Sequence, residues 1–132
     1  MGRVLGTVAM AVGVTLAAAA CGGSDDDPPV TLEGVTNDHG TKTAADGLEV
    51  EADDVYFGPT FIRATAGQTF SVELRNEGNA RHSFTSPALK VDQDLEPGAT
   101  RTLTIQAPAS GTAVFTCRYH EIQGMKGAVF VP

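Results

Sequence analysis

The feature that most constrains the fold is a repeated two-residue alternation of apolar and polar side chains, which begins at residue 47. Successive side chains of a β-strand point to opposite faces, so each alternating segment predicts a strand with one buried face. Turn formers such as Glu96-Pro97-Gly98 separate these segments, and no convincing helical period follows residue 47. The expected strands are 48–53, 70–75, 102–107, 113–118 and a short apolar strand at 128–131.

Short strands at this spacing predict an all-β fold, an antiparallel sandwich in which each sheet has one polar face. Residues 47–132 are enough for one hydrophobic core and no second domain. The 15 glycines and 7 prolines suit a fold with many turns. With 9 basic and 16 acidic residues, the formal net charge is −7. No basic surface is available to neutralise phosphates, which argues against nucleic-acid binding.

Residues 1–20 have the form of an export signal. A cationic start at Arg3 precedes an uncharged run rich in small residues, from Val4 to Ala20. The run is short for a membrane-spanning helix and is typical of a cleavable segment. It ends at Cys21-Gly22-Gly23 and resembles a bacterial lipoprotein signal, in which Cys21 becomes the lipidated first residue. We expect an exported protein anchored to the outer face of the cytoplasmic membrane. A periplasmic or secreted protein, cut near Cys21, is the alternative.

Residues 21–46 are predicted to be a flexible acidic linker. The run Asp25-Asp26-Asp27-Pro28-Pro29 cannot bury enough apolar area to offset the entropy lost on ordering. His39 falls in this segment, and we expect it to be a solvated loop residue rather than a metal ligand.

The side chains with distinctive chemistry gather near the end of the chain. Cys117, His120 and Met125 supply a thiol, an imidazole and a thioether within nine residues, between two expected strands. Cys117 continues the alternation of Ala113 and Phe115, so its side chain is expected to point into the end of the sandwich. The following loop can bring the other two donors to the same point. A fourth ligand must come from elsewhere, and of the remaining histidines only His82 lies in the folded part.

This donor set favours copper. Thiolate and thioether are soft donors, which favour copper over magnesium, calcium or manganese. Two imidazoles and a thiolate in one plane, with a weak axial methionine, describe a blue-copper site. Zinc prefers a closed tetrahedral set of nitrogen, sulfur and carboxylate ligands and is the poorer interpretation. The pairs Asp53-Asp54 and Asp92/Asp94 are interpreted as solvated loop charges, because no calcium-loop pattern accompanies them.

The Cys117-x2-His120-x4-Met125 segment resembles the cupredoxins, with the spacing found in their plastocyanin- and pseudoazurin-like members. Gly124-Met125-Lys126-Gly127 and the terminal strand are similar to the same family, as is Asn79-Ala80-Arg81-His82. The resemblance covers residues 47–132. It implies a Greek-key β-sandwich with one type 1 copper ion at one end, bound by His82, Cys117, His120 and Met125.

Three positions depart from the family pattern. Ser83 stands where Asn is common and usually ties the two ligand segments together. Arg118 stands where Ser or Thr is common. No proline lies between Cys117 and Met125. None of these departures removes a ligand.

We therefore expect a single-electron Cu(I)/Cu(II) carrier that is not an enzyme, because four protein donors leave no open position for a substrate. Its partner would be a redox protein of unknown identity, docking on an apolar rim formed by Tyr119, Ile122 and the Gly124 backbone. A monomer is expected. The alternative function is a copper carrier or scavenger that delivers or buffers copper in the cell envelope. If Cys21 is not lipidated, a Cys21–Cys117 disulfide is the rival role for the two cysteines.

Overall fold

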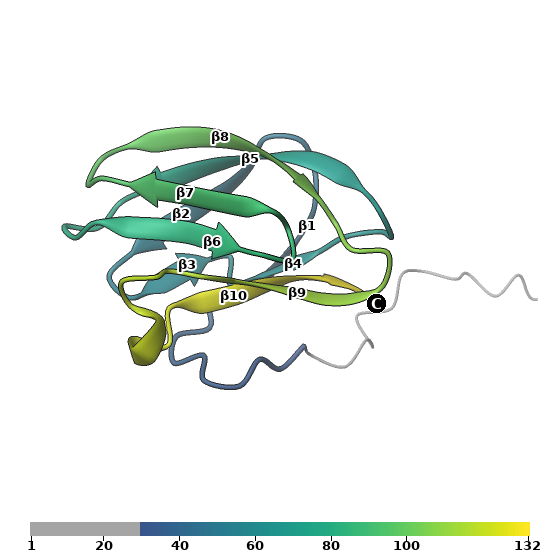
Figure 1. Cartoon of the computed structure of the whole chain (residues 1–132), viewed down its shortest axis with the longest axis horizontal. Helices are drawn as coiled ribbons and strands as arrows, with labels where there is room; N and C mark the ends of the chain where they lie inside the picture. Colours follow the sequence, from purple (N-terminus) through teal and green to yellow (C-terminus); the bar gives the residue numbers. More distant parts are fainter. Residues whose placement is uncertain (1–29) are drawn as a thin grey trace, which may run out of the picture.

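The fold is a sandwich of two β-sheets, seen in a computed structural model that describes residues 30–132 (Figure 1). The larger sheet has six strands in the order β1-β4-β10-β9-β6-β7, and the smaller has four in the order β3-β2-β5-β8. Within these residues the one helical element is the 3-10 helix η1, Glu121–Gln123. The strands are β1 (Thr41–Thr43), β2 (Leu48–Asp53), β3 (Tyr56–Gly58), β4 (Phe61–Arg63), β5 (Thr69–Asn76), β6 (His82–Ser86), β7 (Val91–Leu95), β8 (Thr100–Gln106), β9 (Gly111–Thr116) and β10 (Lys126–Val131).

The alternating segments form strands as predicted, and the all-β class is confirmed. In β5, Phe70, Val72 and Leu74 are buried while the residues between them are more exposed. Each sheet turns its apolar face inward, so the core lies between the two sheets. Phe115 on β9 stacks on Phe84 with ring centroids 4.4 Å apart. This contact fixes β9 near its end, at a position two residues before Cys117.

The pairing is mixed rather than antiparallel throughout, which corrects the prediction. β1 and β10 both pair in parallel with β4, and β2 pairs in parallel with β5. Alternation reports which face of a strand is buried, but it does not identify the neighbouring strand. The parallel pairs join strands that are not consecutive in the chain. A long connection also brings β6 beside β9, and these two strands pair antiparallel with Thr85 opposite Thr116.

The folded part begins before residue 47, so the predicted boundary of the linker is wrong. β1 pairs with β4, and Ala44 belongs to the core. Val30 and Leu32 pack against a small apolar cluster on the outer side of β4 and β10. The sequence hides β1 because all three of its side chains are exposed, so no alternation marks it.

The predictions for residues 1–29 lie outside the described residues. These are the export signal over 1–20, lipidation at Cys21 and the first part of the acidic linker. Among the residues that the structure describes, no helix is long and apolar enough to cross a membrane.

Candidate metal centre

The predicted ligands come from two segments that the larger sheet holds side by side. His82 is the first residue of β6, and Cys117 directly follows β9. Because β6 and β9 are antiparallel neighbours, these two residues lie at the same end of the sandwich. His120 precedes η1 and Met125 precedes β10, so both belong to the loop that leaves Cys117.

Three of the four donor groups face one another. The Cys117 Sγ lies 3.8 Å from Nδ1 of His82 and 3.4 Å from Nδ1 of His120. The potential ligand atoms of these three residues all lie within 4.8 Å of one another. Metal–nitrogen and metal–sulfur bonds of about 2.0–2.3 Å allow two donors on one ion to be at most about 4.4 Å apart. Both sulfur–nitrogen separations meet this limit, so the thiol and each of the two imidazoles can bind the same metal ion.

The loop places Met125 against the same centre through its backbone. The Cys117 N–H donates to the Met125 carbonyl at 3.0 Å, and the Met125 N–H donates to the His120 carbonyl at 3.2 Å. Gly124 ends η1 at φ +84, a left-handed conformation that glycine adopts without a steric cost and that lets the chain turn back. Met125 is completely buried. The structure therefore gathers all four predicted ligands at one end of the sandwich.

The environment of His82 favours its metal-binding form. Cys117 is completely buried and His82 is 1% exposed, whereas His120 is partly exposed. Burial lowers the pKa of His82 below its usual value, and the nearby His120 lowers it further, while Asp54 and Asp53 act in the opposite direction. A neutral imidazole is the form that binds a metal. Gly78 makes room for this ring, because a Cβ there would lie 3.0 Å from Nε2 of His82.

Ser83 joins the two ligand segments, a role that sequence reasoning left in doubt. Its backbone N–H donates to the Cys117 Sγ at 3.4 Å. Its hydroxyl accepts a hydrogen bond from the Arg118 N–H at 2.9 Å. The sulfur of Cys117 and the backbone just after it are thus both held by one residue next to His82. The departure from the common Asn leaves this connection intact.

Asp92 and Asp94 lie on β7 rather than in a loop as predicted, and these partly exposed carboxylates balance two arginines beside the ligand loop. Arg81 pairs with Asp94 at 2.9 Å, and Arg118 pairs with both Asp92 and Asp94. The ring of Tyr119 has both guanidinium groups within 6 Å of its centroid, at 5.3 and 5.9 Å. Its hydroxyl donates to Asp94 at 2.9 Å. Partial burial and this hydrogen bond raise the pKa of Tyr119.

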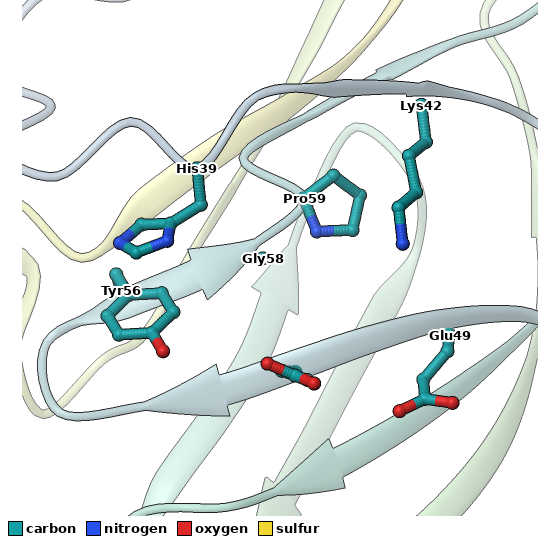
Figure 2. Close-up of a pocket in the computed structure, with 7 residues that line it drawn as sticks. His39, Lys42, Glu49, Tyr56, Gly58 and Pro59 are labelled. Carbon is teal, nitrogen blue, oxygen red and sulfur yellow. The ribbon is translucent and has the colours of Figure 1, made fainter.

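His39 lies outside the group of metal-binding side chains. It stacks on Tyr56, with ring centroids 3.6 Å apart and an interplanar angle of 11°. Figure 2 shows these two rings at one end of a cleft of about 360 Å³, with Lys42 and Glu49 toward the other end. The histidine is therefore exposed but fixed by stacking, and it is no ligand of the candidate centre.

A second acidic group is explained by a cation within it. Carboxylate oxygens of Glu49, Glu51 and Glu77 lie within 4.8 Å of one another. Arg75 donates to Glu73 and lies 4.0 Å from Glu49. Its pKa is raised by the hydrogen bond to Glu73 and by the charges of Glu49, Glu73 and Glu77. Two of the three carboxylates, those of Glu49 and Glu77, therefore act on a guanidinium, and we assign no metal to this group.

The fold and the centre together define a β-sandwich with a buried sulfur–nitrogen metal site at one end. The chain belongs to the Cupredoxin-like domain family, whose sequence profile matches residues 8–131. The donor set of His82, Cys117, His120 and Met125 is that of a type 1 copper-like site. No curated protein matches the sequence.

Solved structures share the fold at low sequence identity. Reduced auracyanin from Roseiflexus castenholzii is 22% identical, with a TM-score of 0.57 over 67% of this chain and 98% of that chain. Auracyanin A, a "blue" copper protein from Chloroflexus aurantiacus, is 20% identical, with a TM-score of 0.54 over 70% of this chain and all of that chain. A copper nitrite reductase from Nitrosomonas europaea is 23% identical, with a TM-score of 0.53 over 69% of this chain and 41% of that chain. The shared fold therefore occurs in blue copper proteins and in enzymes, and function must be argued from the site.

Proposed function

We propose that this protein is a type 1 copper electron carrier on the outer face of the cell membrane. One observation carries the proposal: Nδ1 of His82 and Nδ1 of His120 face the buried Cys117 Sγ. The buried Met125 lies in the loop that follows Cys117, and its backbone is hydrogen-bonded to Cys117 and His120. When bound, copper supplies one-electron Cu(I)/Cu(II) chemistry. This combination of donors is the one used for electron transfer.

The chain's own residues hold the donors in place before a metal arrives. The Ser83 N–H donates to the Cys117 sulfur and helps to fix its position. The backbone hydrogen bonds among Cys117, His120 and Met125 fix the loop. Donors held in this way need little movement when the metal changes charge, which suits a carrier of single electrons. Since protein donors fill every position of the proposed site, no place remains for a substrate, and we propose no enzymatic activity.

The surface over His120 is the proposed point of contact with a redox partner. His120 is the most exposed of the four ligands, and Ile122 beside it is completely exposed. Tyr119 is 41% exposed, and the guanidinium groups of Arg81 and Arg118 lie 5.3 and 5.9 Å from its ring centroid. Carboxylates neutralise both arginines, so the centre of this surface is close to balanced in charge. The net charge of −7 favours a partner with a basic face, mainly through the rate of encounter.

The test is the absorption spectrum of the purified protein after addition of Cu(II). A thiolate bound to Cu(II) should give an intense visible charge-transfer band. Cys117→Ala should abolish the band, whereas Cys21→Ser, which removes the other cysteine, should leave it unchanged. A colourless loaded protein, or a band that survives Cys117→Ala, would contradict the ligand assignment.

A second measurement separates electron transfer from copper delivery. A carrier of electrons should exchange them with a small redox mediator much faster than it loses copper to a competing chelator. The burial of Cys117, His82 and Met125 supports slow release. Copper transfer to the chelator on the timescale of electron exchange would favour the delivery function instead.

A further inference from the structure

The ligand loop has little support of its own on its outer side. Between His120 and Met125 it consists of the three-residue helix η1 and Gly124, and the side chains of η1 are all exposed. The hydrogen bonds within it are short-range, from the N–H of Gln123 to His120 and from the N–H of Gly124 to Glu121. Such a short 3-10 turn is marginal by itself, and no proline stiffens it. The loop that carries two ligands therefore needs an external contact.

Residues 30–40, which we name the N-terminal strap, supply that contact. The Thr36 hydroxyl donates to the carbonyl of Gln123 at 2.8 Å. This carbonyl is at the C-terminal end of η1, where carbonyl groups have no partner inside the helix. The two backbones also touch, because a Cβ on Gly124 would lie 2.5 Å from the Gly34 carbonyl oxygen and 2.7 Å from Thr36. Figure 1 shows the strap passing beside η1 and β10.

The strap is itself fixed on both sides of Thr36. On one side, Val30 and Leu32 pack against the apolar cluster of Phe61, Ala128 and Phe130. On the other side, the His39 N–H donates to the Thr60 hydroxyl at 2.7 Å. The Gly40 carbonyl accepts hydrogen bonds from the N–H groups of Thr60 and Phe61. Because β4 and β10 hold it, the strap can restrain the loop rather than move with it.

We propose that Thr36 is a positioning residue for the metal site, and that the strap fixes the loop between His120 and Met125. The functional part of this proposal rests on the proposed function, because a restrained loop would keep the Met125 donor in one place during electron exchange. Its structural part concerns the loop alone and applies to the metal-free protein as well. The segment next to the predicted membrane tether thus takes part in the site instead of serving only as a spacer.

The experiment is amide hydrogen exchange on the metal-free full chain, compared between Thr36→Val and Thr31→Val. Thr36→Val removes the hydroxyl but keeps the side-chain shape. Thr31 lies in the same strap, and its hydroxyl makes no hydrogen bond within the described residues. We expect the amides of Gly124 and Met125 to exchange about 2- to 10-fold faster in Thr36→Val, the range of one net hydrogen bond. Thr31→Val and the amides of β5 should be unchanged. Equal exchange in both variants would overturn the proposal.

A second variant tests whether the strap acts as one unit. Leu32→Ser weakens the apolar anchor without touching the loop, and it should also speed exchange at Gly124 and Met125. In the double variant the combined factor should be smaller than the product of the two, because both changes release the same segment. A full product would overturn the proposal.

In the copper-loaded protein, the reduction potential and the visible band test whether Thr36 positions the metal site, because a purely structural role would leave both unchanged. Thr36→Val should shift the reduction potential and the position of the visible band, while Thr31→Val should shift neither. If the loaded protein has no band at all but the exchange difference is present, the proposed function fails and the role of the strap stands. An unchanged potential and band in Thr36→Val would overturn the positioning role.

Discussion

Ser83→Ala provides a quantitative test of how the two ligand segments are joined. The substitution removes the hydroxyl that accepts the Arg118 N–H at 2.9 Å and leaves that donor without its protein partner. Ser83 is 1% exposed, so its hydroxyl makes its hydrogen bonds to protein groups. The backbone N–H of Ser83 still donates to the Cys117 sulfur, because the substitution does not alter the backbone.

The expected loss of stability follows from the burial of the donor. An unsatisfied buried donor costs about 1–3 kcal/mol, and the Arg118 N–H is only partly buried, so we expect about 1–2 kcal/mol. The Thr85 hydroxyl, which also contacts Ser83 at 2.9 Å, retains a second contact with Asp92. For a domain of roughly 100 residues, this loss lowers the midpoint of thermal unfolding by about 4–15 °C.

The assay is urea unfolding of the metal-free protein, followed by circular dichroism. Ser110→Ala is the matched control, because Ser110 is exposed in the turn before β9. Its free energy of unfolding should change by less than about 0.5 kcal/mol. If Ser83→Ala falls within the same limit, the hydroxyl does not join the two segments and our explanation of this position is refuted.

Three further changes test other parts of the structure. Gly127→Ala should destabilise the protein by about 3 kcal/mol or more in the same urea assay, because a Cβ would overlap the Thr60 carbonyl and lie 2.5 Å from the Phe115 ring. Gly58→Ala is the control and should cost far less, because its Cβ would meet its neighbours at 3.6 Å. Equal losses of stability in the two variants would contradict this explanation. Met125→Gln should keep copper bound and lower the reduction potential measured by voltammetry, because an oxygen donor favours Cu(II), whereas His120→Gly should open the site to added imidazole; complete loss of copper from Met125→Gln would argue against a weak axial role. Cys21→Ser should move the protein from the membrane fraction to the soluble fraction of bacterial cells, and unchanged membrane association would exclude a lipid anchor at Cys21.

The strands that face the core could be predicted from the sequence, because a strand with one buried face alternates apolar and polar residues. β2, β5, β8 and β9 each place apolar side chains at every second position, and the structure buries all of these positions except Leu48 and Leu103, which are partly buried. The spacing of Cys117, His120 and Met125 was equally readable, because one short loop carries all three donors. Local sequence was therefore sufficient for the fold class and for the chemistry of three ligands.

What only the tertiary structure decided is which distant segments meet. The partner of β9 at the metal end is β6, some thirty residues earlier, and their pairing brings His82 to Cys117 and the Ser83 hydroxyl to Arg118. The alternation of a strand gives no information about its neighbour, because backbone hydrogen bonds are the same for every sequence. The strap was hidden for a related reason. The strap contacts the ligand loop through the Thr36 hydroxyl and through a close backbone approach to Gly124. Neither contact produces a recognisable sequence pattern in a polar segment.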